Sequence, residues 1–165
     1  MSDQLLNVLF ICTGNSARSI LAEGILNAMG GNRFKAYSAG SHPKGEVHPM
    51  ALDVLQRLGM AQQEGFRSKN WDEFASPTAP VMHFVFTVCD NAAGEVCPVW
   101  PGQPLTAHWG VYDPAAVEGS DDKKYHAFND VAQILKRRIE LMLSLPPQSL
   151  QSLSIQAQLN AIGQS

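Results

Sequence analysis

Short apolar runs and helical patterns alternate along this chain. The runs Leu5–Ile11 and Val81–Cys89 are apolar almost throughout and rich in branched or aromatic residues, as is typical of strands buried on both faces. Two weaker runs, Arg33–Ser38 and Leu105–Trp109, predict two further strands. Because Val81–Cys89 is the strongest of these runs, we expect it to lie in the centre of a sheet.

Between the strands, apolar residues recur every three or four positions, which is the spacing of one helical face. In the longest such segment, Phe128, Val131, Leu135, Ile139 and Met142 share a face. Glycine or proline ends several of these segments, as expected of helix boundaries. The helices predicted in this way are Ala17–Met29, Pro49–Gly59, Trp71–Phe74, Tyr125–Leu145 and Leu150–Ile162.

Strands that alternate with helices predict an α/β fold, here a four-stranded parallel sheet flanked by helices on both faces. In such sheets the active site lies at the carboxyl ends of the strands. We expect one domain over residues 1–145 and a C-terminal helical extension over residues 146–165. The extension either covers the core or contacts another subunit, so the oligomeric state stays open.

Composition narrows the class of protein. The chain has 165 residues, a net charge of −3 and a pI of about 5.9, which argues against binding nucleic acid. No apolar run approaches the roughly 20 residues of a membrane span, and the N-terminus resembles a strand rather than a signal peptide. We therefore expect a cytoplasmic location. Three cysteines in a reducing compartment favour catalysis or redox exchange over structural disulfides.

The segment CTGNSARS, residues 12–19, places a cysteine and an arginine around a turn between a strand and a helix. Backbone N–H groups of such a turn, together with the helix dipole, form a nest for a tetrahedral oxyanion. Arg18 can close the nest with a bidentate fork. The oxyanion-binding residues expected are Thr13, Gly14, Asn15, Ser16, Ala17 and Arg18.

Cys12 is the candidate nucleophile of this nest. The positive field of the turn favours its thiolate form, and Ser19 is placed to donate a hydrogen bond to that thiolate. Gly14 and Asn15 tolerate the left-handed backbone that the turn demands. The plainer alternative is a buried cysteine at a strand end beside an ordinary surface arginine.

CTGNSARS, the segment Tyr37-Ser38-Ala39-Gly40 and a later Asp-Pro resemble the low-molecular-weight protein tyrosine phosphatase superfamily. TVCDNAAGEVCP and HWGVYDPA are similar to its arsenate reductase branch, and the resemblance covers about residues 5–143. It implies that Asp113 is the general acid, which protonates the leaving oxygen when Cys12 attacks. That role agrees with the chemistry, because a poor leaving group needs a proton.

Two features favour reduction of arsenate over hydrolysis of phosphotyrosine. Phosphatases of this fold usually carry an aromatic wall directly after the Asp-Pro, whereas this chain has Ala115 there. The chain also has Cys89 and Cys97. The first alternative is a phosphatase acting through Cys12, and the second is a non-catalytic protein that binds oxyanions or senses redox state.

The resemblance implies a thiol relay. After Cys12 attacks arsenate, Cys89 would attack Cys12, and Cys97 would then attack Cys89, leaving a disulfide for an external dithiol such as thioredoxin. Cys89 and Cys97 are eight positions apart, one more than the commonest spacing in the thioredoxin-coupled branch. Either cysteine could instead be a packing residue. If Cys97 takes no part, glutathione or mycothiol with a glutaredoxin-like partner would complete the cycle. No tightly bound cofactor is expected.

The candidates for metal binding are few. The histidines show no metal-ligand spacing. Asn15, Glu23 and Ser38 resemble positions that hold a structural potassium ion in some relatives. Glu23 on a helix face could equally pair with a basic side chain.

Overall fold

The described part of the chain forms one parallel sheet with helices packed on it. In this computed structural model, residues 5–31, 33–62, 65–88, 104–146 and 155–163 are described. The sheet has the strand order β2-β1-β3-β4, and every pair is parallel, as expected. The strands are β1 (Leu6–Cys12), β2 (Phe34–Gly40), β3 (Phe84–Thr87) and β4 (Leu105–His108).

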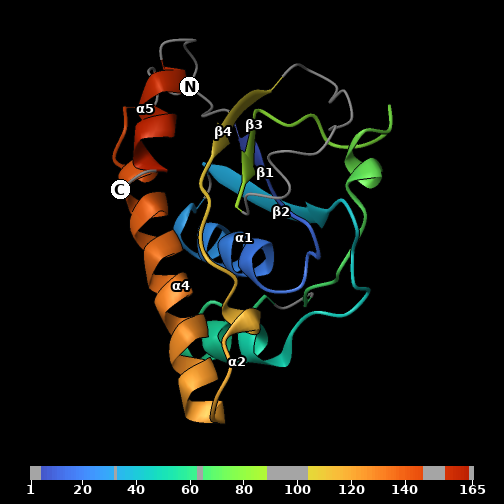
Figure 1. The fold of residues 1–165 in the computed structure, drawn as a ribbon. Coiled ribbons are helices and arrows are strands. Elements are labelled where there is room, and N and C mark those ends of the chain that lie inside the picture. Colours follow the sequence, from blue (N-terminus) through green and yellow to red (C-terminus); the bar gives the residue numbers. More distant parts are fainter. Residues whose placement is uncertain (1–4, 32, 63–64, 89–103, 147–154, 164–165) are drawn as a thin grey trace.

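Helices connect and cover these strands (Figure 1). They are α1 (Arg18–Met29), α2 (Pro49–Arg57), α4 (Asp121–Leu143) and α5 (Ile155–Ile162), with the short 3-10 helices η1 (Trp71–Phe74) and η2 (Pro114–Ala116). Helix α1 packs against β1 and β2, while α4 and α2 pack against α1. The four-stranded α/β architecture predicted from the sequence is confirmed.

The two faces of the sheet are covered differently. On the face of α1, Phe10, Phe86 and Trp109 form an aromatic cluster, in which the rings of Phe86 and Trp109 stack at 4.1 Å. Neighbouring residues of a strand point to opposite faces, so Tyr37 lies on the other side from Ser38. There Tyr37 contacts Phe74 of η1. Among the described residues, η1 is thus the helical element on that face.

Some element boundaries differ from those expected. The strand predicted over Val81–Cys89 is shorter, since β3 ends at Thr87 and residue 89 lies outside the described part. The helix predicted from Tyr125 begins at Asp121 instead. The reason is a capping signal, because Ser120 accepts a hydrogen bond from Lys123 N and acidic residues occupy the first turn.

The C-terminal helix α5 covers the core rather than standing apart. It packs against β4 and α4, and Leu159 is fully buried. The indole N–H of Trp109 donates to the Leu159 carbonyl at 2.9 Å. A Cβ on Gly163 would clash with the His108 carbonyl oxygen, so the close approach to β4 requires glycine there. Residues 147–154, which precede α5, lie outside the described part.

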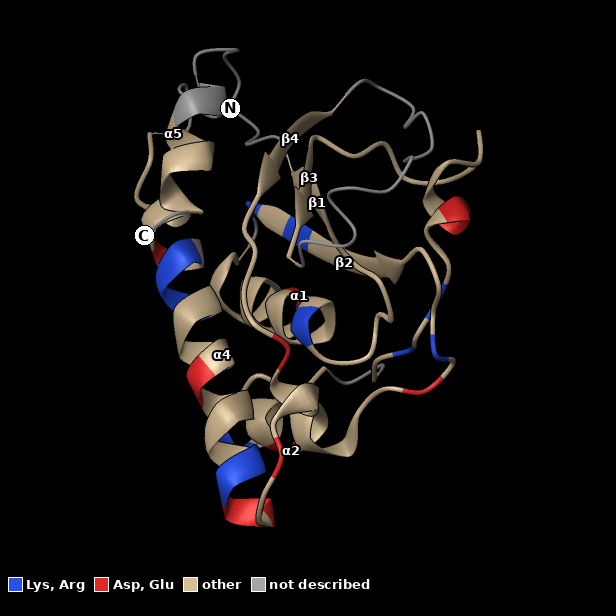
Figure 2. Ribbon diagram, in the orientation of Figure 1, with Lys and Arg blue, Asp and Glu red and all other residues tan. Residues whose placement is uncertain are grey.

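Charged residues are unevenly placed on the fold (Figure 2). Strands β1, β3 and β4 contain none, whereas α4 carries both signs along its length. No helix among the described residues is long and apolar enough to span a membrane.

Candidate active site

The turn between β1 and α1, residues 12–18 and here called the anion loop, has the form of an oxyanion nest. Cys12 is the last residue of β1 and is 3% exposed, and Arg18 is the first residue of α1. Helix α1 has neither a side-chain cap at Ala17 nor an acidic residue in its first turn. Its first N–H groups are therefore not used by a side-chain cap and can serve an anion.

The carbonyl groups of the anion loop are held outward by the segment that follows β2. Backbone N–H groups of His42, Lys44 and His48 donate to the carbonyls of Thr13, Gly14 and Ser16 at 2.9, 3.0 and 2.9 Å. Within one trans peptide group, the N–H and the C=O point in opposite directions. These bonds therefore turn the loop N–H groups toward the interior of the nest.

Asn15 holds the loop in its unusual shape. Its φ is 45°, and among the described residues it is the one non-glycine with positive φ. Its amide nitrogen donates to Ser19 Oγ at 2.8 Å, and its amide oxygen accepts from the backbone N–H of Lys69, also at 2.8 Å. Fully buried and bonded at both ends, this side chain offsets the cost of the left-handed backbone.

Ser19 lies against Cys12, the candidate nucleophile. Its Oγ is 3.0 Å from Cys12 Sγ. A hydroxyl has one proton, and Ser19 already accepts from Asn15. Its proton is therefore available to Cys12, which is the arrangement expected from the sequence.

Gly40 at the end of β2 was not singled out as a site residue. A Cβ there would lie 2.5 Å from the Thr13 carbonyl oxygen and 3.0 Å from the Asn15 Cβ. Only glycine lets β2 approach the anion loop this closely. Its place at the end of the segment Tyr37-Ser38-Ala39-Gly40 was the available signal.

Asp113 lies beside the anion loop although it is distant in sequence. Its Oδ1 accepts from the Ala115 N–H at 3.0 Å and thereby caps η2, while its Oδ2 lies 3.8 Å from Arg18 Nη2. Arg18 Nη1 also donates to the Val111 carbonyl at 3.2 Å. One carboxylate oxygen is thus held by the backbone, and the other faces the mouth of the nest.

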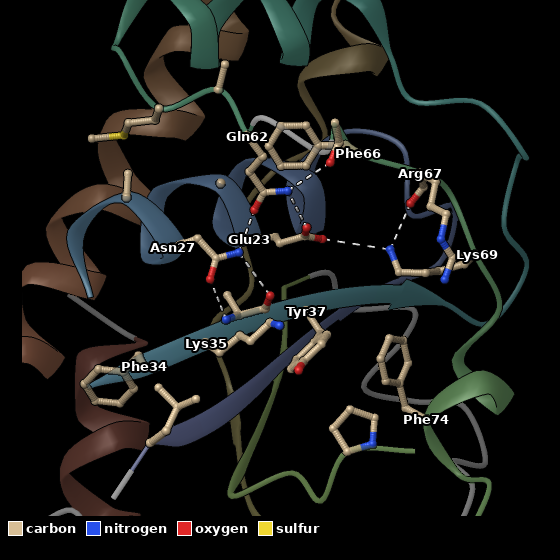
Figure 3. A pocket seen from close by; sticks show the side chains of 18 of the residues that line it. Glu23, Asn27, Phe34, Lys35, Tyr37, Gln62, Phe66, Arg67, Lys69 and Phe74 are labelled. Carbon is tan, nitrogen blue, oxygen red and sulfur yellow. Dashed lines mark hydrogen bonds and ion pairs between the residues drawn. The ribbon is translucent and has the colours of Figure 1, made fainter. Parts of the chain in front are cut away.

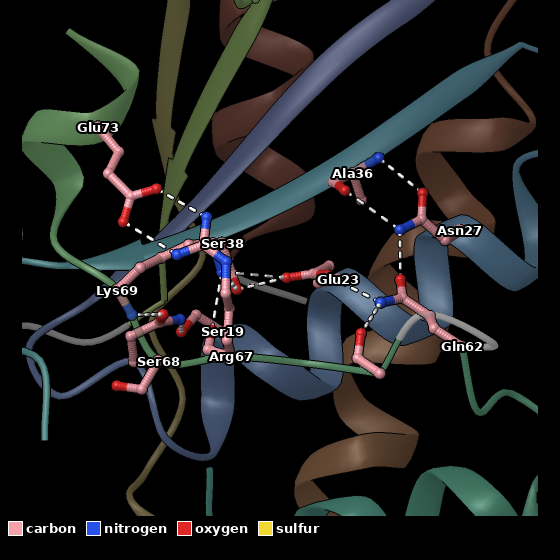
Figure 4. Close-up of polar contacts among 12 residues, drawn as sticks. Ser19, Glu23, Asn27, Ala36, Ser38, Gln62, Arg67, Ser68, Lys69 and Glu73 are labelled. Atoms are coloured by element: carbon pink, nitrogen blue, oxygen red, sulfur yellow. Dashed lines mark hydrogen bonds and ion pairs between the residues drawn. The ribbon is translucent and has the colours of Figure 1, made fainter. Parts of the chain in front are cut away.

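A second polar cluster, formed by Glu23, Ser38 and Lys69, lies next to the anion loop and is linked to it by the Lys69 backbone (Figure 4). Ser38 Oγ donates to Glu23 Oε1, and Lys69 Nζ lies 3.9 Å from the same oxygen and 3.5 Å from Ser38 Oγ. Nζ also donates to the Arg67 carbonyl at 2.9 Å. Burial lowers the pKa of Lys69, and the Glu23 carboxylate opposes that shift.

Lys69 bears on the potassium hypothesis. Its ammonium stands beside the carboxylate of Glu23 and the hydroxyl of Ser38, which are groups that a potassium ion would use. The pairing of Glu23 with a basic side chain, the alternative drawn from the sequence, is what the structure contains. Potassium binding itself stays a prediction.

A groove runs beside β2, next to this cluster (Figure 3). Glu23, Lys69 and Gln62 lie on one side of it, and Gln62 donates to Glu23 Oε2 at 3.0 Å. Tyr37 and Phe74 add aromatic lining. In the described part of the chain, no residue of the anion loop lines this groove, so it is separate from the nest.

The structure therefore brings together Cys12, Ser19, Arg18, Asn15 and Asp113. The other oxyanion-binding residues expected, Thr13, Gly14, Ser16 and Ala17, lie in the same loop, whereas the two expected relay residues, Cys89 and Cys97, lie outside the described residues. The last described residue before them, Val88, donates its N–H to the Ile11 carbonyl at 2.8 Å.

Comparison with known proteins agrees with this geometry. An arsenate reductase of Halalkalibacterium halodurans is 35% identical over 133 residues, which are 81% of this chain and 91% of that protein. An arsenate reductase of Bacillus subtilis is 32% identical with the same coverage. A solved structure, described as an arsenate reductase in oxidized state, matches with a TM-score of 0.66 at 24% identity, covering 84% of this chain and 96% of that one.

A family model also matches most of the chain. It is described as low molecular weight phosphotyrosine protein phosphatase, and it matches residues 7–157. The match includes the anion loop, the segment after β2 and the Asp113-Pro114 turn. The chain belongs to the low molecular weight phosphotyrosine protein phosphatase family.

Proposed function

We propose that this chain reduces arsenate to arsenite, with Cys12 as the nucleophile. The observation that carries the proposal is the anion loop, in which inward N–H groups and Arg18 surround a cysteine that Ser19 can hydrogen-bond. Relatives that share most of the chain are arsenate reductases, which supports arsenate as the oxyanion.

In the first step the Cys12 thiolate attacks arsenic. A sulfur–arsenic bond forms and one arsenic–oxygen bond breaks, while Asp113 gives its proton to the departing oxygen, which leaves as water. Arsenic stays in the +5 state. The Asp113 oxygen that faces Arg18 is the one suited to carry this proton, because the other already caps η2.

In the second step the thiolate of Cys89 attacks Cys12 Sγ. The electron pair of the sulfur–arsenic bond stays on arsenic, so arsenic is reduced by two electrons and leaves as arsenite while a Cys12–Cys89 disulfide forms. The backbone hydrogen bond from the Val88 N–H to the Ile11 carbonyl supports this step, since these residues directly precede Cys89 and Cys12.

Regeneration completes the cycle. Cys97 attacks Cys89 and frees Cys12, and an external dithiol such as thioredoxin then reduces the Cys89–Cys97 disulfide. If Cys97 takes no part, glutathione or mycothiol with a glutaredoxin-like protein would reduce the first disulfide. A cycle that consumes external thiols requires a reducing compartment, so we place the chain in the cytoplasm.

The segment around Asp113, residues 109–116, favours a small oxyanion over an aromatic ester. Ala115 follows Asp113-Pro114, and the hydroxyl of Tyr112 donates to Asp130 of α4 at 2.8 Å. Trp109 is fully buried. The residue directly after Asp113-Pro114 is thus a small alanine, and the buried Trp109 cannot replace it, so a phenol ring gains no stacking surface at that position.

The test is arsenite production from arsenate with thioredoxin, thioredoxin reductase and NADPH, for wild type, Cys89→Ser and Cys97→Ser. Hydrolysis of an aryl phosphate is followed in parallel. We expect each substitution to abolish arsenate turnover and to spare ester hydrolysis. If only Cys97→Ser retains turnover, an external thiol completes the cycle.

Two results would replace the proposal. Ester hydrolysis without arsenite formation under any thiol system would make this chain a phosphatase. Binding of oxyanions without turnover, unaffected by Asp113→Asn, would make it a binding or redox-sensing protein.

A further inference from the structure

Helix α4 carries a buried arginine in its apolar face. Arg138 is 7% exposed and follows Val131 and Leu135 at helical spacing. Burial lowers the pKa of its guanidinium. Its Nε is buried without a hydrogen-bond partner, and no carboxylate within the described ranges forms an ion pair with it.

A buried charge without a counter-ion is costly, so its partners indicate what it does. Arg138 Nη1 donates to two successive carbonyls, those of Trp109 at 2.9 Å and Gly110 at 3.0 Å. These residues follow β4 and begin the segment 109–113, here called the acid loop because it ends at Asp113. A leucine at position 138 would suit the apolar face better but would leave both carbonyls without these donors.

The same loop is tied to the nest at its other end. Arg18 Nη1 donates to the Val111 carbonyl, and Asp113 Oδ2 lies beside Arg18 Nη2. Between Gly110 and Val111 there is only one peptide bond. A shift of the Gly110 carbonyl therefore moves the chain that leads to the carboxylate of Asp113, whereas Arg18 keeps its place as the first residue of α1.

We propose that Arg138 is a positioning residue for the general acid. It clamps the start of the acid loop against α4, so that Asp113 is held at the mouth of the nest beside Arg18. This inference rests on the proposed role of Asp113. Arg138 makes no hydrogen bond to Cys12 or to the rest of the anion loop in the described part of the chain. Its loss therefore acts on protonation of the leaving group and not on anion binding.

The test compares two aryl phosphates with different leaving groups. Phenolate leaves poorly and needs the acid, whereas 4-nitrophenolate leaves readily without much help. The variants are Arg138→Met, which keeps the length of the stem, Arg138→Lys, Asp113→Asn as the benchmark, and Arg137→Met as the matched control. Arg137 is the neighbouring, exposed arginine of α4.

For Arg138→Met we expect kcat/KM for phenyl phosphate to fall at least about tenfold further than for 4-nitrophenyl phosphate, in the same direction as for Asp113→Asn. The inhibition constant of inorganic phosphate should stay within about twofold of wild type, because the nest is intact. Arg138→Lys should recover part of the loss, since an ammonium can reach one carbonyl. Arg137→Met should match wild type in every measurement.

Equal losses on both esters, or a weakened phosphate affinity, would overturn the positioning role and leave a structural one. Thermal unfolding shows whether Arg138→Met is folded. If it is not, the two esters are compared with Arg138→Lys instead. The two proposals fail separately. A wild type that cleaves esters but makes no arsenite refutes arsenate reduction and still allows the test of Arg138. A wild type that turns over neither esters nor arsenate refutes both Asp113 as the general acid and Arg138 as its positioning residue.

Discussion

The ion pair of Lys69 and Glu23 offers the sharpest test of the cluster behind the anion loop. Their side chains are 8% and 10% exposed, and their charged atoms lie 3.9 Å apart. Lys69→Met removes the ammonium and keeps much of the stem, while Glu23→Gln removes the opposite charge at nearly constant shape. The two single variants and the double variant form a complete cycle.

The magnitude follows from the geometry. Two unit charges at 3.9 Å attract by about 4 kcal/mol at an effective dielectric constant of about 20. Breaking a buried pair by removing one partner costs about 3–5 kcal/mol. We expect the lower end for Lys69→Met, about 3 kcal/mol, because Glu23 keeps the donors Ser38 and Gln62. The double variant should lose less than the sum of the single variants.

The assay is urea unfolding at neutral pH, followed by circular dichroism and extrapolated linearly to water. We expect a coupling energy of about 2–4 kcal/mol between Lys69 and Glu23. The matched control is the exposed pair Asp53–Arg57 of α2, whose charges are closer, at 3.3 Å, but whose side chains are 45% and 65% exposed. Its coupling should be at most about 0.5 kcal/mol.

A coupling energy below about 1 kcal/mol for the buried pair would refute the reasoning, because that is the range of exposed pairs. It would mean that the ammonium is not held beside Glu23. A double variant less stable than the sum of the singles would contradict it as well, since then the charges would not stabilise one another.

Three further predictions concern the nest and its surroundings. Ser19→Ala removes the hydrogen bond to Cys12 and also the acceptor of the Asn15 amide, so arsenate turnover should fall about tenfold to a hundredfold; an unchanged rate would exclude the bond to Cys12 from the mechanism. Gly40→Ala forces a Cβ against the Thr13 carbonyl, so urea unfolding should show a loss of about 1–3 kcal/mol and phosphate should inhibit more weakly; native phosphate affinity would contradict this. His48 accepts a hydrogen bond from Met50 N, and burial, followed by the charge of Lys44, lowers its pKa. The unfolded chain therefore takes up the proton first, so the free energy of unfolding should fall as pH drops through about 6.5. His48→Asn keeps a cap and should flatten the dependence of stability on pH between pH 5 and 8 in urea titrations; an unchanged slope would assign the effect to another group.

Local sequence patterns predict the strands and helices of this fold. An apolar run such as Leu5–Ile11 has one stable solution, a strand buried on both faces, and β1 follows it to within one residue. Boundaries were less predictable where a short-range signal competed with periodicity. Ser120 and the acids after it extend α4 by a turn that carries no apolar stripe.

The nest was also predictable, because its parts are contiguous. Residues 12–19 contain the candidate nucleophile, the arginine and the serine, and the short turn between β1 and α1 places Ser19 against Cys12. What this segment cannot encode is its own support. The carbonyl partners come from His42, Lys44 and His48, and the backbone partner of Asn15 comes from Lys69.

Pairs that are distant along the chain were decided by tertiary structure alone. Asp113 meets Arg18, and Lys69 meets Glu23, because parallel strands bring their carboxyl ends to one edge and deliver loops of unrelated sequence there. Arg138 shows the division most clearly. It follows Val131 and Leu135 at helical spacing, but the carbonyls that explain its burial, Trp109 and Gly110, belong to a loop that only folding lays against the helix. Periodicity specifies which side of an element is buried, and packing specifies what that side contacts.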